Sequence, residues 1–313
     1  MTVLVTGADG FVGRWLVRAL LAAGHPVVGT TLPGSRPPRV SGAGEVRWIP
    51  LDLTDPVSVH RVAAEPVDAV AHLAAAASGG DALKDPGRAW EVNAAGTARL
   101  LAELGRRRAA GDADPLVLVV STGEVYGAGG HRPFVETDPV RPRSPYAASK
   151  AGAELAARET AERTALRVVI ARAFPHTGPG QDERFVVPAF TRRLMLARRL
   201  RSRVVKVGNL DVTRDILDVR DVAAAYVALL AGGAGGETYN VATGQGVMLS
   251  DLFDRIAAIV GVAAIPEADP ELVRPADLPY LVGDGARLRA ATGWTPHHDL
   301  DRTLRDLVDA QAD

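Results

Sequence analysis

The chain has 313 residues, a formal net charge of −1 and 47% hydrophobic residues. It contains no cysteine, which excludes a disulfide framework and a thiolate metal site, and its balanced charge provides no field for nucleic acid. Since no apolar run approaches ~18 residues and no signal segment precedes the first strand, we expect a cytoplasmic protein that binds neither membrane, nucleic acid nor metal.

The first elements along the chain are a strand, a glycine turn and a helix. An apolar run over residues 2–6 is typical of a strand, and apolar residues at helical spacing follow over residues 11–23. Between them stands the pattern G-x-x-G-x-x-G. Glycine lets backbone turn tightly beside a pyrophosphate, and a helix N-terminus attracts the anion with its N–H groups. The sequence therefore predicts a dinucleotide site formed by Gly7, Gly10, Phe11, Val12 and Gly13.

The end of the second strand, over residues 27–31, bears on the choice of cofactor. An NAD site usually has Asp or Glu there for the ribose 2′-hydroxyl, whereas an NADP site offers a cation to the 2′-phosphate. This strand ends in Thr31, and Arg36 and Arg39 follow. The residues favour NADP(H), with Thr31 and Arg36 as contacts and NAD(H) as the second choice. An exposed loop charge is the alternative for Arg36.

The later elements continue to alternate between strand and helix. Strands are expected near residues 46–50, 68–73, 116–121, 167–172 and 237–241, and helices near residues 86–109, 145–163, 189–200, 220–231, 250–260 and 301–311. This order predicts an α/β protein with a doubly wound parallel Rossmann sheet, whose ligand lies beyond the carboxyl ends of the strands.

A tyrosine and a lysine stand four residues apart in the run Ser144-Pro-Tyr-Ala-Ala-Ser-Lys150. Lysine is scarce here, since the chain has three lysines among 36 basic residues. Positions i and i+4 share a helix face, so the Lys150 ammonium is expected to lower the pKa of the Tyr146 phenol and prepare it to pass a proton. A surface lysine beside a half-buried tyrosine is the alternative.

Several further motifs occur in a fixed order between these two sites. They are Leu51-Asp52-Leu53, His72-Leu-Ala-Ala75, Val92-Asn93 and Ser121-Thr-Gly-Glu-Val-Tyr-Gly127. With the glycine turn and Y-x-x-x-K, the set resembles the extended short-chain dehydrogenase/reductase family over nearly the whole chain. The resemblance implies that Asp52 and Leu53 flank the adenine, that Ala74 lies along the cofactor, and that Thr122 completes a catalytic triad with Tyr146 and Lys150. It also implies that Lys150 holds the cofactor ribose.

The resemblance also implies a division into lobes and a mode of assembly. A Pro- and Gly-rich segment over residues 175–180 and a less regular C-terminal third indicate a discontinuous substrate lobe. We expect a Rossmann domain over residues 1–174 and 220–246, and a smaller lobe over residues 175–219 and 247–313. The helices near residues 86–109 and 145–163 correspond to those that form a four-helix bundle between two subunits of the family, so a homodimer is expected.

Further motifs in the second half of the chain lie within residues 205–222, 236–242, 272–279 and 292–296. They resemble the branch of the family that handles GDP-sugars, especially the GDP-4-keto-6-deoxy-D-mannose reductases and the GDP-mannose 4,6-dehydratases. Arg214 and Arg274 suit a diphosphate because a guanidinium binds phosphate oxygens bidentately, and pairing with an acidic neighbour is the alternative for each. The other substrate contacts that the resemblance implies are Ser78, Glu124, His176 and Asn209.

Two departures from the family pattern narrow the function. Pro175 replaces an asparagine that usually contacts substrate, and Gly123 replaces the acid or hydroxyl that dehydratases carry before the residue matching Glu124. We therefore expect NADP(H)-dependent reduction of GDP-4-keto-6-deoxy-D-mannose to GDP-D-rhamnose, with the nucleotide base, the exact sugar and the product configuration left open. The alternatives are a GDP-mannose 4,6-dehydratase, a nucleotide-sugar 4-epimerase and a dinucleotide sensor without catalysis.

Overall fold

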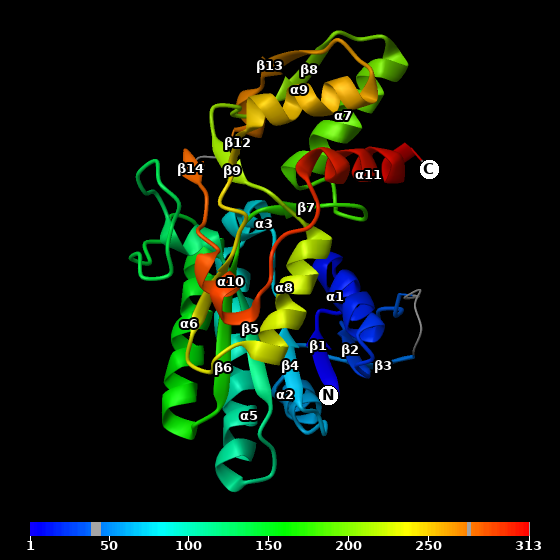
Figure 1. Ribbon diagram of the computed structural model, residues 1–313. Coiled ribbons are helices and arrows are strands. Elements are labelled where there is room, and N and C mark those ends of the chain that lie inside the picture. Colours follow the sequence, from blue (N-terminus) through cyan, green and yellow to red (C-terminus); the bar gives the residue numbers. More distant parts are fainter. Residues whose placement is uncertain (39–44, 274–276, 313) are drawn as a thin grey trace.

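A seven-stranded sheet forms the centre of the computed structural model, which describes residues 1–38, 45–273 and 277–312 (Figure 1). Each neighbouring pair of strands in this sheet is parallel. The short apolar runs form it as expected, and the predicted Rossmann sheet is confirmed. From edge to edge the strands are β11 (Thr238–Val241), β6 (Arg167–Ala173), β5 (Leu116–Thr122), β4 (Ala69–His72), β1 (Val3–Thr6), β2 (Val27–Thr31) and β3 (Val46–Pro50).

Helices cover both faces of the sheet. On one face α1 (Phe11–Ala22) packs against α8 (Val219–Gly232), and both bury apolar stripes in one core with β1 and β5. On the other face α5 (Thr97–Ala110) lies between α2 (Pro56–Ala63) and α6 (Pro145–Thr164), over a second core. Buried from both sides, the strands other than the edge strand β3 read as largely apolar runs, which is typical of parallel sheets.

The helix predicted over residues 86–109 is divided in the structure. It consists of α4 (Pro86–Ala89), a π-helical stretch (Trp90–Gly96) and α5, and the short helix α3 (Gly79–Lys84) precedes it. A side chain at Gly96 would place its Cβ 2.7 Å from the Cβ of Leu53, so the glycine permits this close approach. The wider π-helical turn directs Asn93 into the interior, where it is fully buried. Such turns are frequent at functional sites.

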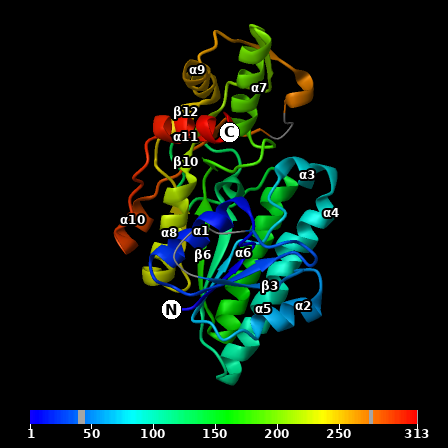
Figure 2. The same cartoon turned by 90° about the vertical axis from the view of Figure 1, so that its right-hand side faces the viewer.

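The smaller lobe lies beyond the carboxyl ends of the central strands, as Figure 2 shows. It has its own apolar core, which includes Phe190, Leu194, Phe253, Ile256 and Leu304. Its elements are α7 (Val186–Leu200), α9 (Leu249–Val260), α11 (Leu300–Ala312), β7 (His176–Thr177), β8 (Val204–Val207), β9 (Thr213–Asp215), β10 (Leu217–Asp218), β12 (Gly246–Met248), β13 (Ile265–Ala268), β14 (Tyr280–Leu281) and the 3-10 turn Pro270–Leu272. A second 3-10 turn, Gly123–Tyr126, follows β5 in the large lobe.

The packing of the C-terminal third differs in one respect from the expected division. The helix α10 (Ala286–Thr292) contacts α8 and β11, and Leu288 and Trp294 are buried in the core of the large lobe. The stretch assigned to the smaller lobe over residues 247–313 thus returns to the Rossmann side before α11. We propose that the two-lobe division holds with α10 as part of the large lobe.

One short segment, residues 214–221, contacts each described chain crossing between the lobes, and we call it the crossing segment. Asp215 accepts hydrogen bonds from the backbone of Thr243, Gly244 and Gly283. Asp218 accepts from the Thr303 hydroxyl. The Asp221 carboxylate accepts a hydrogen bond from the His298 backbone N–H and is hydrogen-bonded to the Nδ1 atom of its ring. The strand β10 pairs with β7. Buried carboxylates are stable only when hydrogen-bonded, so these three aspartates fix the lobes together.

Two absences hold for the described ranges. None of their helices is long and apolar enough to span a bilayer. Within the same ranges no cluster of three or more His, Asp or Glu side chains is placed to bind a metal ion.

Candidate active site

The glycine turn between β1 and α1 leaves room for a ligand against the backbone. Gly7 has a φ of +67°, and a Cβ there would lie 2.9 Å from the Ala74 nitrogen. At Gly13 a Cβ would lie 2.1 Å from the Gly7 oxygen. No side chain caps the N-terminus of α1 at Gly10. The first N–H groups of the helix therefore face a glycine-lined cradle that fits a pyrophosphate, with Phe11 and Val12 in the first turn.

The other predicted cofactor residues lie along the same edge of the sheet. Thr31 is buried at the end of β2, and Arg36 is exposed in the loop that follows. Asp52 follows β3 and accepts two hydrogen bonds from Thr54, which lower the pKa of its carboxyl, and Leu53 beside it is buried. The backbone N–H of Ala74, after β4, donates to Thr6. Together with the glycine turn after β1, these positions follow the four adjacent strands β4, β1, β2 and β3, as a dinucleotide site requires.

The proposed catalytic residues meet where β5 ends and α6 begins. Thr122 is the last residue of β5, and Tyr146 stands in the first turn of α6, where Ser144 caps the helix by accepting from the Ala147 N–H at 3.1 Å. The Thr122 hydroxyl is hydrogen-bonded to the Tyr146 phenol, and the Glu124 carboxylate acts on the same phenol. The structure thus brings together residues separated in sequence by a long loop.

The pKa of the Tyr146 phenol lies above its ordinary value, so the expected lowering is wrong. The side chain is only half-buried by its exposed surface, yet the groups packed around the phenol remove water from it, and this desolvation is the main cause. The Glu124 carboxylate adds to it, and the hydrogen bond from Thr122 opposes both. The prediction considered only the neighbouring lysine and not the loss of water around the ring. The consequence is a phenol that stays protonated at neutral pH and can act as a proton donor.

Lys150 is 4% exposed, one helical turn after Tyr146. Burial lowers the pKa of its ammonium to about 8, and the Glu154 carboxylate opposes that shift. The lysine in turn contributes, after burial, to lowering the pKa of His72 to about 3, so this imidazole is neutral. A buried lysine close to its titration range is typical of a functional group.

A buried polar network joins the cofactor side of the site to α6. His72 bonds Thr6 at 2.8 Å and Thr97 at 2.9 Å through its two ring nitrogens. Asn93 accepts from the Ala76 N–H at 2.7 Å and donates to the Ser149 hydroxyl at 2.9 Å. His72, Asn93 and Ser149 lie within the recognised motifs, but Thr97 and Ala76 do not. The contacts of Asn93 and Thr97 involve the π-helical turn and the residue directly after it, and nothing in the sequence signalled that turn.

The predicted substrate residues are mostly bonded to their own surroundings. Ser78 caps α3 by accepting from the Asp81 N–H, and Asn209 accepts from the Asp211 N–H. His176 bonds the Phe174 oxygen, and its ring stacks on Phe11 with centroids 6.2 Å apart. These contacts hold each side chain to its own surroundings, and their binding of a sugar nucleotide stays a prediction.

The remaining predictions for the substrate side concern the two arginines proposed for the diphosphate and the proline that replaces the usual asparagine. The Arg214 guanidinium donates to Asp277 at 2.6 Å and to the Leu278 oxygen at 2.6 Å. This acidic pairing is the alternative that the sequence allowed. Arg274 lies outside the described residues. The Pro175 oxygen accepts from the Leu217 N–H and so joins the loop to the crossing segment.

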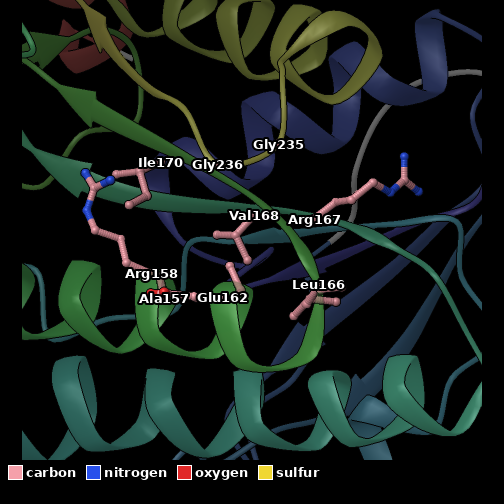
Figure 3. Close-up of a pocket in the computed structure, with 11 residues that line it drawn as sticks. Ala157, Arg158, Glu162, Leu166, Arg167, Val168, Ile170, Gly235 and Gly236 are labelled. Atoms are coloured by element: carbon pink, nitrogen blue, oxygen red, sulfur yellow. The ribbon is translucent and has the colours of Figure 1, made fainter.

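A separate hollow of about 490 Å³ lies at the other end of α6 (Figure 3). Its floor is apolar, and Arg158 and Arg167 point away from each other at its two ends, as Figure 3 shows. Ala161 in its wall is fifteen residues beyond Tyr146, or roughly 22 Å along the helix at ~1.5 Å per residue. The hollow is therefore remote from the catalytic residues.

Comparison with known proteins gives a consistent result over the whole chain. Residues 4–307 match the family described as GDP-mannose 4,6 dehydratase. The chain is 35% identical to the GDP-6-deoxy-D-mannose reductase of Pseudomonas aeruginosa, across 97% of this chain and 95% of the relative.

Two solved structures agree with that match. The structure of RMD from Pseudomonas aeruginosa complexed with NADPH has a TM-score of 0.84 and 34% identity, covering 99% of this chain and 98% of its own. The Thermus thermophilus UDP-glucose 4-epimerase complex with NAD has a TM-score of 0.85 and 32% identity, with the same coverage. Reductase and epimerase thus share this architecture with the present chain.

Proposed function

We propose that this chain, which belongs to the GDP-mannose 4,6 dehydratase family within the extended short-chain dehydrogenases/reductases, is an NADP(H)-dependent reductase of a nucleotide-activated 4-keto-6-deoxyhexose. The preferred substrate is GDP-4-keto-6-deoxy-D-mannose and the product GDP-D-rhamnose. The proposal agrees with the identity to a reductase and with the residues of the site. It places the chain among enzymes that consume reduced cofactor.

The observation that carries the choice of reduction over dehydration is the packing around Gly123. A Cβ at this position would lie 2.9 to 3.0 Å from three ring atoms of Phe174, which is completely buried. The acid or hydroxyl that dehydratases carry before the residue matching Glu124 therefore has no room here unless Phe174 moves. Contacts this short are overpacked and costly.

The mechanism assigns a separate task to each catalytic side chain. A nicotinamide dinucleotide supplies the hydride for the keto carbon when it is bound. Tyr146 donates its proton to the keto oxygen, and its raised pKa keeps that proton available. Thr122 hydrogen-bonds the same oxygen, and the Lys150 ammonium stabilises the phenolate that remains.

Cofactor binding is assigned to the residues along the edge of the sheet. The N-terminus of α1 and the cradle of Gly7, Gly10 and Gly13 suit the pyrophosphate. Thr31 presents no carboxylate at the end of β2, and Arg36 is exposed nearby, which suits a 2′-phosphate. NADP(H) is therefore the proposed cofactor, and NAD(H) is the second.

The decisive experiment follows NADPH absorbance with two substrates. With GDP-4-keto-6-deoxy-D-mannose we expect NADPH to be consumed in a one-to-one ratio with product. GDP-mannose alone should consume none and give no 4-keto product. Formation of a 4-keto sugar from GDP-mannose without added NADPH would reject reduction in favour of dehydration.

One observation favours the dehydratase or epimerase as the second candidate. Glu124 lies close enough to Tyr146 to raise the pKa of its phenol, so a second acid or base stands beside the proposed proton donor. Both alternatives return the hydride to the substrate. Consumption of NADPH that stops once each enzyme molecule has oxidised one NADPH would support these alternatives.

We also propose a homodimer formed by the helices around α5 and α6. Leu155 on α6 is 70% exposed and Trp90 is 46% exposed, and a dimer through these helices would cover both large apolar side chains. One chain has a mass of 32.8 kDa, and light scattering at micromolar concentration should give twice this mass. Leu155→Asp should shift the mass to that of a monomer, whereas Leu83→Asp on α3 serves as the control.

A further inference from the structure

A buried ion pair stands directly behind the catalytic residues. Glu154 on α6 and Arg172 on β6 are each 3% exposed. The Arg172 guanidinium binds the Glu154 carboxylate bidentately, with Nε–Oε1 at 3.0 Å and Nη2–Oε2 at 2.7 Å. The Ser121 hydroxyl donates to the same carboxylate at 2.6 Å. The carboxylate is therefore held in one position by contacts from two strands.

The arginine is also held from its other side. Its Nη1 donates to the backbone carbonyl oxygen of Glu136, and its guanidinium carbon lies 4.8 Å from the centre of the Tyr126 ring. Removing two charges from water is costly and is often not repaid in stability, compared with an apolar pair of the same volume. A fully bonded buried pair at this place therefore suggests a role besides folding.

That role concerns the neighbouring lysine. Lys150 and Glu154 are i and i+4 on α6, so they lie on the same face of the helix, and both are buried. The Glu154 carboxylate counteracts the effect of burial on the Lys150 ammonium. Arg172 is bonded to the same carboxylate from β6.

The other ionisable groups around Lys150 do not supply this charge. Tyr146 on the same helix keeps its proton, and His72 on β4 is neutral. Glu124, after β5, acts on the Tyr146 phenol, and Asn93 on the π-helical turn is an uncharged amide. Arg158, one turn further along α6, is 3.9 Å from Glu154 and faces solvent.

We propose that Glu154 is a positioning residue for Lys150, whose carboxylate, fixed by Ser121 and Arg172, provides the counter-charge that keeps the buried ammonium charged. The use of that charge in catalysis rests on the proposed function. The counter-charge itself is a property of the folded protein and can be tested without substrate.

The test is a direct titration of the lysine. Because the chain contains only Lys84, Lys150 and Lys206, labelling lysine with ¹³C at Cε gives three NMR signals, of which Lys150 is assigned by its loss in Lys150→Arg. The other two serve as internal references, since Lys84 is exposed and the Lys206 side chain is 63% exposed. The chemical shift is followed between about pH 6 and pH 10.5, a range that brackets the titration of Lys150, whose pKa burial lowers to about 8.

Variants of Glu154 separate charge from shape. Glu154→Gln should lower the titration midpoint of Lys150 by about one pH unit, since it removes the carboxylate charge and leaves the Arg172 cation. Glu154→Asp, which keeps the charge, should leave the midpoint within about 0.3 units. The matched control is Glu159→Gln, on the same helix but exposed and paired with Arg163, which should leave the midpoint unchanged.

A double variant guards against loss of the fold. Glu154→Leu with Arg172→Met replaces the pair by apolar side chains of similar volume, so no buried charge is left unpaired. Its midpoint should fall by less than in Glu154→Gln. An unchanged Lys150 midpoint in any folded variant that lacks the carboxylate, the double variant included, would overturn the proposal. Failure of the protein to reduce any sugar would not affect this result.

Discussion

The cofactor side and the substrate side of this molecule differ in how their polar groups are used. Along the sheet edge, the turn from Gly7 to Gly13 keeps backbone N–H groups available to a ligand. In the smaller lobe and at its rim, Asn209 and Arg214 already bond their own neighbours. A short motif therefore suffices to predict the cofactor side, whereas the substrate side depends on contacts between residues far apart in the sequence.

The largest expected effect is on the proton donor. Tyr146→Phe should lower kcat by roughly 10²- to 10⁴-fold, the usual contribution of a positioned acid, and retain NADPH binding. Stopped-flow or steady-state rates with a 4-keto sugar would measure it, with binding followed by NADPH fluorescence. Tyr280→Phe in the smaller lobe is the control. A kcat near that of the wild type would remove Tyr146 from the mechanism.

The next effect concerns the cradle. Gly13→Ala places a methyl group against the Gly7 oxygen, so we expect the free energy of unfolding to fall by about 1–3 kcal/mol and NADPH affinity to fall with it. Thermal unfolding and fluorescence titration would measure both. Gly79→Ala is the matched control, because nothing lies within 4 Å of the added methyl there. Unchanged affinity in Gly13→Ala would argue against the cradle as the pyrophosphate site.

On the substrate side, Arg214→Ala tests whether an arginine that is bonded to Asp277 still binds substrate. If it contacts the diphosphate, KM for the nucleotide sugar should rise about tenfold while kcat changes little, because an interaction with the non-reacting part of the substrate is lost. Asp277→Asn keeps the arginine and removes its partner charge, and should leave KM near the wild-type value. Equal stability losses in both variants without a change in KM would assign the arginine to structure alone.

The smallest effect distinguishes the two cofactors. Arg36→Ala should weaken NADPH by up to about tenfold, corresponding to one charge-assisted contact of about 1.4 kcal/mol, and should leave NADH nearly unaffected. Arg302→Ala on α11 is the control. An equal loss for NADPH and NADH, or none, would make Arg36 an ordinary loop residue.

The sequence predicted the seven central strands and most long helices because apolar runs and glycine turns are local signals. It did not predict the π-helical turn, which depends on the approach of Gly96 to Leu53. It gave the wrong direction for the pKa of Tyr146, since burial depends on the whole fold. Glu154 was also missed, although the small residues Ala153 and Ala157 around it are typical of a helix face in close packing.

The crossing segment has a consequence for how ligands enter. Asp215 fastens the chain near residues 243–244 and 283, and Asp218 and Asp221 fasten α11 and the stretch that leads into it. Opening the lobes as two rigid bodies would therefore break several buried hydrogen bonds at once. Exposed contacts are easier to release, such as the 2.8 Å ion pair of Arg184 with Asp81 between the two lobes. We therefore expect the proposed nucleotide-sugar substrate to enter through movement of α3 and the residues before α7, while the crossing segment keeps its hydrogen bonds throughout turnover.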